Sequence, residues 1–491
     1  MASTETRRWI PLGVWVIVVL TIVCIPGTIV GYGFLPVDDA MRHAAKVVSG
    51  KSWQEILVMR PDFAMDLHPG WHALLGALYR WQECGIERLV VLPVFGMAVL
   101  VWLVGALWLR RPEAWLAALL AGVLLMPDFM MRLMLGRPFL LSMAILLTLL
   151  PVWSRVEGRR PRLWELALTI GLLAAAAWIH GSFYLFALPG AAILLTGRWR
   201  QALWFGGSWL AGSFIGASFT GHPWQFLHQS LQLLFGAFGT HLVTRQLVGE
   251  FQPSDASCLV VLAVAAMLLW RSRLPNWKAR ELLNPIFMTG VLGWVLGLAV
   301  VRFWIDWGLP ALLLWLALEL QEEFERSISF ESGKRAVLAA GLSLALFLAA
   351  TADRDSRWTS NLTNEYLTPQ NPELAGWLPG NDGIIYCADM LVFYETFFRN
   401  PTAPWRYVLG FEPALMQPED LDVLRKFQWN HGDCRAFGLW VRKMRPNDRL
   451  IIRPTAGVPD IPNMEWCYAL RDLWIGRLQP GTNSAAAPKA P

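Results

Sequence analysis

The fold of this chain is decided by a stretch near its start, residues 9–30, which reads WIPLGVWVIVVLTIVCIPGTIV. The stretch has no charged side chain, and about 20 mostly apolar residues let a helix cross the hydrocarbon core of a membrane. Arg7 and Arg8 precede it, as in a signal peptide, but the run is long and lacks an Ala-x-Ala cleavage site. We therefore expect an uncleaved transmembrane anchor.

The composition of the whole chain points the same way. Of its 491 residues, 55% are hydrophobic and 16% are charged, and the mean hydropathy is +0.40. Soluble domains are about 45–50% apolar and about 25% charged, so a soluble protein of this composition would expose large apolar patches. Disordered, collagen-like and disulfide-dense classes are excluded as well. An integral membrane protein is left, and its net charge of +5 requires no nucleic-acid partner.

Similar apolar runs recur along the chain and predict a mostly α, polytopic membrane protein with about eleven transmembrane helices. Several runs are short, as in broken helices. The predicted spans are Trp9–Val30, Leu89–Leu109, Ala114–Met130, Phe139–Trp153, Leu163–Ile179, Phe183–Leu195, Ala202–Phe219, Ser257–Trp270, Pro285–Val300, Trp304–Leu320 and Ala336–Ala350.

The orientation follows from the basic residues, because short loops rich in Lys and Arg stay in the cytoplasm. When the loops are assigned alternately to the two sides, starting inside, every inside loop is basic. The basic residues on the inside are Arg7, Arg8, Arg110, Arg111, Arg155, Arg159, Arg160, Arg162, Arg198, Arg200, Arg271, Arg273, Lys278, Arg280, Lys334 and Arg335. This predicts a multi-pass protein of the inner (cytoplasmic) membrane, with a cytoplasmic N-terminus and a periplasmic C-terminus.

This topology divides the chain into three parts. We expect a transmembrane domain over residues 1–352 with outer loops at 31–88 and 220–256, an extracytoplasmic α/β domain over 353–478, and a disordered tail over 479–491. The α/β prediction rests on strand-like and helix-like runs, which are Gly383–Cys387, Arg406–Phe411, Arg449–Ile452 and Pro418–Phe427. An oxidising outer compartment favours one disulfide, with undetermined pairing, among Cys84, Cys387, Cys434 and Cys467.

The first outer loop gathers acidic and histidine residues, in FLPVDDAMRHA at 34–44 and DLHPGWH at 66–72. Asp38 or Asp39 has two readings. It is the N-cap of a surface helix, or it is a carboxylate that acts as a general base or binds a divalent metal beside cations that hold a phosphate. All eight histidines fall at outward positions, so we expect the chemistry on the outer face; they are His43, His68, His72, His180, His222, His228, His241 and His431.

This arrangement resembles the GT-C superfamily of membrane glycosyltransferases, in particular the branch with ArnT-like lipid A transferases and protein O-mannosyltransferases. The family follows its first span with Asp-Glu-x-Arg-Tyr-Ala at the start of a surface helix, and Lys-Pro, Leu-Pro and Lys-Gly landmarks come later. The matching positions here are Asp39, Arg42, Ala44, His68-Pro69, Leu92-Pro93 and His180-Gly181. The resemblance covers the membrane part of the chain, and topology supports it more than identity does.

The resemblance implies transfer of a sugar at the outer face. The donor would be a polyprenyl-phosphate-linked sugar in the lipid bilayer, and the acceptor an envelope glycolipid, glycan or protein. Asp39 or Asp38 would activate or orient the acceptor hydroxyl. The expected substrate-binding residues are Arg42, His43, Asp66, His68, His72, Arg137, His180, His222 and Arg302. No nucleotide-binding loop is needed, and the sequence contains neither GxGxxG nor GxxxxGK[ST].

The sequence departs from the family at two points. Both positions where the family carries Lys hold His, which titrates near neutral pH and can also bind a metal. The acidic residue expected after the third span is not evident. Donor binding is therefore expected to be built differently here.

Further charged residues near the outer face have two readings each. Arg132 and Arg137, at the outer ends of the third and fourth spans, either snorkel to lipid headgroups or contact a phosphate. Arg302 either pairs with Asp306 or binds a lipid phosphate. His222 and His228 fall in a stretch typical of an interfacial amphipathic helix, where they either anchor the helix or contact substrate.

Other functions stay open beside the transferase: a transporter or flippase of lipid-linked sugars, a polysaccharide polymerase or ligase, and a non-catalytic envelope protein. Ion-coupled transport needs ionisable residues near mid-membrane, whereas the middles of the predicted spans are nearly free of charge. The acidic pair after the first span favours a transferase over a polymerase or ligase.

Overall fold

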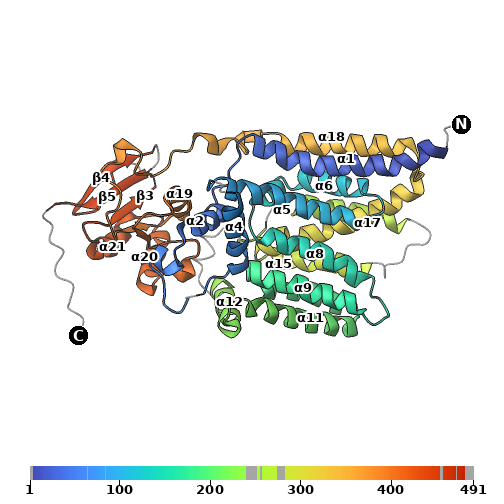
Figure 1. Cartoon of the computed structure of the whole chain (residues 1–491), viewed down its shortest axis with the longest axis horizontal. Coiled ribbons are helices and arrows are strands. Elements are labelled where there is room, and N and C mark those ends of the chain that lie inside the picture. The colour runs from blue at the N-terminus through green and yellow to red at the C-terminus, as the bar shows by residue number, and fades with distance from the viewer. Residues whose placement is uncertain are drawn as a thin grey trace.

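The computed structural model describes residues 4–63, 65–82, 85–238, 252–254, 257–273, 282–453, 457–470 and 473–480. A bundle of long helices forms most of the described chain, and a small five-stranded sheet lies at one end of it (Figure 1). The N-terminal end of α1 lies at the opposite end of the bundle from the sheet. The predicted combination of a mostly helical protein with a small C-terminal α/β part is confirmed at this level.

The first 352 residues contribute the bundle and the helices at its sheet-side end. Their helices are α1 (Thr4–Gly31), α2 (Asp39–Ser49), α3 (Trp53–Ile56), α4 (Pro69–Gln82), α5 (Arg88–Leu107), α6 (Glu113–Leu125), α7 (Asp128–Leu133), α8 (Phe139–Ser154), α9 (Leu163–His180), α10 (Ala187–Leu195), α11 (Trp199–Ser218), α12 (Pro223–Phe238), α14 (Cys258–Ser272), α15 (Pro285–Gly297), α16 (Val301–Phe303), α17 (Leu309–Ser327) and α18 (Gly333–Thr351). A 3₁₀ turn (Phe183–Phe186) precedes α10, and a π-helical turn (Trp304–Gly308) joins α16 to α17.

Five helical stretches in the described residues are long and apolar enough to cross a membrane. They are Trp9–Gly31, Arg88–Leu107, Leu163–His180, Val301–Ser327 and Gly333–Thr351. Five shorter apolar helices accompany them. Each of the eleven predicted spans overlaps a helix, but the ends differ: the third stops at Leu125, because Pro127 interrupts the chain before α7. These helices support a multi-pass membrane protein.

Apolar side chains also cover the outside of the bundle, as expected where lipid replaces water. On α18, Val337 is 74% exposed and Leu344 is 60% exposed, and exposed Leu and Trp side chains also lie on α9, α11 and α14. In water such a surface would favour aggregation.

Close backbone contacts hold neighbouring helices of the bundle together. A Cβ atom added at Gly212 would lie 2.7 Å from the carbonyl oxygen of Ile170, and one at Gly216 would lie 2.3 Å from that of Ala174. The two glycines are spaced as in GxxxG, a pattern that lets membrane helices approach closely. Helices α9 and α11 therefore pack with their backbones almost in contact.

The C-terminal sheet is mixed, with strand order β2-β1-β3-β5-β4. Its strands are β1 (Ile384–Cys387), β2 (Arg406–Tyr407), β3 (Arg449–Ile452), β4 (Met464–Ala469) and β5 (Leu473–Leu478). Strand β1 runs parallel to β2 and β3, and β5 runs antiparallel to β3 and β4. The β1, β2 and β3 predictions are confirmed, with β2 ending at Tyr407; the β4–β5 hairpin was not predicted.

Helices cover both faces of this sheet because the strands carry apolar side chains on both faces. They are α19 (Met390–Arg399) on one face and α20 (Pro418–Trp429) with α21 (Gly438–Lys443) on the other. Ile385 packs in the cluster that contains α19 residues, whereas its neighbour Tyr386 packs against Trp440 of α21. The prediction of a helix at Pro418–Phe427 is confirmed by α20.

The first outer loop joins the bundle to the sheet. Helices α2 and α4 lie between them (Figure 1), and isolated bridges pair Leu57 with Tyr407 and Met59 with Met416. The structure thus brings Leu57 and Met59 against residues more than 300 positions later in the chain.

The cysteine and tail predictions fall partly on residues outside the described ranges. Cys387, Cys434 and Cys467 are free thiols, as are Cys24 and Cys258, and Cys84 lies outside the described residues. Burial raises the pKa of the Cys387 thiol to about 12, so it is an unreactive core residue. Residues 481–491 of the predicted disordered tail also lie outside the described ranges.

Candidate functional site

A cavity with a volume of about 140 Å³ lies at the sheet-side end of the bundle. Helices α2, α12 and α16 form part of its walls. The rest comes from the loops before α4 and after β2, from the start of α8 and from the segment that follows α9. The lining residues are Asp39, Arg42, Leu67, His68, Arg137, Pro138, Phe139, His180, Gly181, Ser182, Tyr184, Ser230, Leu233, Arg302, Phe411 and Glu412. We call this space the arginine pocket, because three guanidinium groups line it.

The two aspartates at the start of α2 lie in different environments. Asp38 is the N-cap of α2, where it accepts a hydrogen bond from the backbone N–H of Asp39, and it is ion-paired with Arg137. Asp39 lines the arginine pocket and accepts a hydrogen bond of 2.6 Å from Nε of Arg42. The capping role thus belongs to Asp38, and the carboxylate in the pocket is Asp39.

Two further groups hold the Asp39 carboxylate. The phenol of Tyr394, from α19, donates a hydrogen bond of 3.1 Å to its Oδ1. Arg137 lies 3.6 Å away, measured from Nη1 to Oδ2. Asp39 therefore lies among two guanidinium groups and a phenol, a set of charge-assisted contacts that holds the carboxylate in place.

Arg42 is buried and contacts both parts of the protein. Its guanidinium carbon lies 3.9 Å from the ring centroid of Phe411, a cation–π contact with the loop after β2. Its Nη1 atom is buried and has no hydrogen-bond partner among the described residues. A buried guanidinium N–H without a hydrogen-bond partner is costly unless a ligand satisfies it, so this atom is a candidate binding group for an anion.

Arg137 reaches the pocket because the chain turns sharply before α8. The preceding Gly136 has φ +63°, and a Cβ atom there would lie 2.8 Å from the backbone nitrogen of Val94 on α5. Only glycine fits this left-handed, crowded position without strain. The turn places Arg137 between the acidic pair and the pocket.

His180 enters the pocket at the end of α9. Its Nδ1 lies 3.0 Å from the Ser142 hydroxyl, and its Nε2 lies 3.4 Å from Nη2 of Arg302. Gly181 caps the helix with φ +69°, and a Cβ atom there would lie 2.4 Å from the carbonyl oxygen of Leu67. The His-Gly pair identified in the sequence thus joins α9 to the His68 loop.

Linked histidines join α2 to α4 next to the pocket. Oδ2 of Asp66 lies 2.5 Å from Nδ1 of His72, and Nε2 of His72 lies 2.8 Å from Nδ1 of His43. Oδ1 of Asp66 accepts a hydrogen bond from the backbone N–H of His68. Burial alone would raise the pKa of Asp66, but contacts with His72 and His68 bring it well below its usual range. This network joins α2 to α4 and orients the loop that carries His68.

His68, which lines the pocket, and His43 beside it are neutral near pH 7. Burial, assisted by the charge of Arg42, lowers the pKa of His68 to about 3, and the same two causes lower the pKa of His43 well below its usual value. The sequence suggested that His68 could stand in for a cationic Lys. In this structure its imidazole is buried and neutral, and Arg42, Arg137 and Arg302 carry the positive charge of the pocket.

Arg302 and Arg132 share the carboxylate of Asp306 inside the bundle. Nε and Nη2 of Arg132 lie 2.7 and 2.8 Å from the two oxygens of Asp306, and Nε of Arg302 lies 3.5 Å from Oδ2. Arg132 is buried and does not line the pocket. The sequence left snorkelling and phosphate contact open for Arg132. The structure instead shows a bidentate ion pair between Arg132 and Asp306, and the same carboxylate supports Arg302.

The structure brings most of the expected site residues together. Asp39, Arg42, His68, Arg137, His180 and Arg302 line the pocket, and Asp38, His43, Asp66 and His72 lie directly behind it. His222 does not line the pocket; it lies exposed before α12. The helix expected in residues 220–256 is α12, which contributes Ser230 and Leu233. His241 lies outside the described residues.

Sequence reasoning missed every site residue beyond position 352. Tyr394 holds Asp39, Phe411 packs under Arg42, and Glu412 lines the pocket. Burial, with the charge of Asp39, raises the pKa of Glu412 to about 7, against lowering contributions from the Ala414 N–H and the two nearby arginines. The available signal was the lone acid directly after the predicted strand Arg406–Phe411, since loops at strand ends commonly carry functional groups.

A metal site is not formed by the described residues. No group of three or more His, Cys, Asp and Glu side chains within them could hold a metal ion. The cavity is instead lined by three arginines and two histidines, a set of groups that suits an anion.

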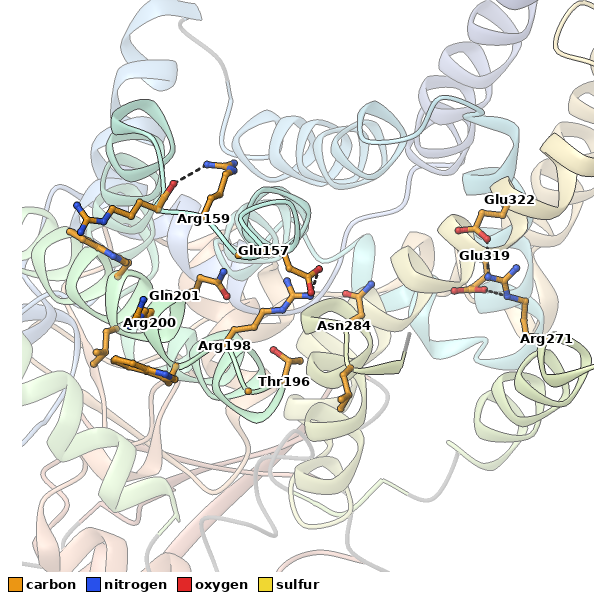
Figure 2. A pocket seen from close by; sticks show the side chains of 17 residues that line it. Glu157, Arg159, Thr196, Arg198, Arg200, Gln201, Arg271, Asn284, Glu319 and Glu322 are labelled. Atoms are coloured by element: carbon orange, nitrogen blue, oxygen red, sulfur yellow. Dashed lines mark hydrogen bonds and ion pairs between the residues drawn. The ribbon is translucent and has the colours of Figure 1, made fainter. Parts of the chain in front are cut away.

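A second, larger hollow lies at the other end of the bundle (Figure 2), among the basic loops. Its cations are largely ion-paired: Arg198 with Glu157, Arg159 with Glu165, and Arg271 with Glu319 and Glu322. Figure 2 shows the Arg198–Glu157 pair well separated from Arg271 and its two glutamates. We therefore place the candidate site in the arginine pocket.

No protein-family model and no curated protein sequence matches this chain.

Proposed function

We propose that this protein is an integral membrane glycosyltransferase that moves a sugar from a polyprenyl-phosphate-linked donor to an envelope acceptor. The acceptor classes are a glycolipid such as lipid A, a polysaccharide or a protein. The observation that carries the proposal is the unpaired Nη1 of Arg42, buried beside the carboxylate of Asp39 in a pocket that also holds Arg137 and Arg302. A phosphodiester anion and a hydroxyl group are the two partners that such a pair of groups recognises.

The position of the pocket suits a lipid-linked donor. Pro138 and Phe139, which line it, begin α8 of the apolar bundle, while Phe411 and Glu412 come from the sheet part. A phosphate in the pocket would therefore lie at the end of the bundle, where lipid headgroups are found, and the polyprenyl tail would run along the apolar helices.

The chemistry follows from the charges. When the acceptor oxygen attacks the anomeric carbon, the sugar–phosphate bond breaks and the leaving polyprenyl phosphate gains negative charge. The guanidinium groups of Arg42, Arg137 and Arg302 stabilise that charge as it develops. His68 and His180 add hydrogen bonds to the phosphate or the sugar. Asp39 contacts the acceptor hydroxyl.

The proposal is tested with purified protein in lipid nanodiscs. Labelled polyprenyl phosphate, the expected leaving group, is the probe, and its Kd is measured for the wild type and for Arg42→Gln. We expect tenfold or weaker binding in the variant, because an arginine–phosphate pair is lost. Arg60→Gln, an exposed arginine of the same loop paired with Asp62, is the matched control and should bind normally. Equal affinity of all three proteins would contradict the proposal.

Transfer itself is tested in cells and in vitro. Mass spectrometry of envelope lipids, glycans and proteins from a deletion strain should show one sugar residue missing from one acceptor. The corresponding polyprenyl-phosphate sugar should then restore that sugar with purified protein. Translocation of the donor without any covalent product would indicate a flippase instead.

A further inference from the structure

We propose that Glu412 is the general base of this transfer and that Asp39 positions the acceptor rather than taking its proton. The inference rests on the proposed function and deepens it by dividing the work between the two carboxyl groups of the pocket. It also gives the C-terminal α/β part a direct role in the reaction, because Glu412 follows β2.

The two carboxyl groups differ first in their partners. Asp39 accepts hydrogen bonds from Arg42 and Tyr394 and is ion-paired with Arg137. In contrast, Oε1 of Glu412 is buried and has no hydrogen-bond partner among the described residues. A carboxylate surrounded by cations is a weak base, whereas a buried, unsatisfied carboxyl oxygen is open to a substrate hydroxyl.

Glu412 also has the acidity that a base needs near neutral pH. The groups that face the pocket from every element around it are Asp39, Arg42, His68, Arg137, His180, Tyr184 and Arg302. Burial, together with the charge of Asp39, outweighs the hydrogen bond from the Ala414 backbone N–H and the charges of Arg302 and Arg42, and raises the pKa of Glu412 to about 7. Proton transfer is most efficient when the catalytic pKa lies near the working pH.

The step balances without any further reactant. The acceptor O–H bond breaks and its proton passes to the Glu412 carboxylate. The acceptor oxygen forms a bond to the anomeric carbon, and the bond between that carbon and the phosphate oxygen breaks. Its electron pair leaves with the polyprenyl phosphate, which the arginines hold. Glu412 then releases the proton to water.

Steady-state kinetics with a polyprenyl-phosphate sugar and its acceptor separate the two roles. Glu412→Gln should lower kcat by about 10²–10⁴ with little change in KM, because only the proton acceptor is lost. The wild-type kcat/KM should rise with pH through an apparent pKa near 7, and this rise should be absent in Glu412→Gln and retained in Glu412→Asp. Glu419→Gln, an exposed glutamate of α20, is the matched control and should behave as the wild type.

A second readout does not depend on turnover. The infrared difference between about pH 5 and about pH 9 should contain the carbonyl band of a protonated carboxyl that titrates near neutrality and is missing in Glu412→Gln. Thermal melts verify that each variant is folded. Absence of this band, or transfer by Glu412→Gln at the wild-type rate and with the wild-type pH profile, would overturn the inference while leaving the proposed function standing. A wild-type protein that transfers no sugar from any polyprenyl-phosphate donor would instead overturn the proposed function.

Discussion

Asp38 and Asp39 are neighbours in the sequence, yet the structure gives them different tasks. Asp38 caps α2 and binds Arg137, whereas Asp39 lies in the arginine pocket against Arg42 and Tyr394. A residue at an N-cap and the residue after it point in different directions, because the backbone changes from extended to helical between them.

This difference predicts separable mutant effects. Asp39→Asn should lower kcat/KM by about 10²-fold, because a positioning contact worth about 2–3 kcal/mol is lost. Asp38→Ala should mainly lower thermal stability, since removal of an N-cap costs about 1 kcal/mol. Kinetics and thermal melts on both proteins check the prediction. Unchanged kcat/KM in Asp39→Asn and Asp38→Asn together would contradict the assignment of the acidic pair to the site.

The raised pKa of Glu412 also has a consequence for stability. Folding raises this pKa from 4.5 to about 7, so the folded state holds the proton more tightly than the unfolded state does. Stability should therefore fall as the pH rises from about 4.5 to about 7 and stay lower above that, by up to about 3 kcal/mol. Glu412→Gln should melt at a higher temperature than the wild type near pH 8, and the gap should close near pH 4. A gap that is equal at both pH values would show that Glu412 does not carry this shift.

At the level of residues, the sequence predicted the acidic, arginine and histidine side chains that the first 352 residues contribute to the pocket. The acidic pair, Arg42 and His68 all fall in one loop, so composition alone drew attention to them. Tyr394 and Glu412 lie more than 300 residues away, and no local pattern indicates that the sheet part packs onto α2. Only the tertiary structure shows that contact.

The presence of each helix was easier to predict than the residues at which it begins and ends. Length and apolar composition mark a membrane helix, and each predicted span overlaps an observed one. The ends depend on single residues: Pro127 separates α6 from α7, and a 3₁₀ turn precedes α10. The β4–β5 hairpin escaped prediction because its strands carry polar residues such as Glu465 and Arg477, which pair across the two strands.

The packing of α9 against α11 gives a prediction at the same scale. Gly216→Ala should lower thermal stability, because its new methyl group would lie 2.3 Å from the carbonyl oxygen of Ala174 and force the helices apart. Gly207→Ala on the same helix meets nothing within 4 Å and should leave stability unchanged or raise it, since Ala favours helix more than Gly does. Thermal melts in the same detergent compare the two. Equal melting temperatures would show that the close approach is not needed.

Across the whole molecule, charge is divided between the two ends of the bundle. The loops with Arg159 and Arg198 meet at one end, and the arginine pocket with the sheet lies at the other. An apolar bundle between two polar ends suits a membrane, and short basic loops favour the cytoplasmic side. We therefore propose that the sheet and the pocket face the periplasm.

This orientation predicts which positions a membrane-impermeant maleimide reaches in intact cells, with a variant free of native cysteines as background. A cysteine at Val458, 63% exposed in the sheet part, should be labelled without permeabilisation. A cysteine at Leu163, 85% exposed beside the basic loop before α9, should be labelled only after the inner membrane is opened. Both positions are exposed, so a difference in labelling reports the membrane and not burial in the protein. Labelling of both in intact cells would show that the two ends share one compartment, and it would remove the argument that the pocket meets a lipid-linked donor at the outer face.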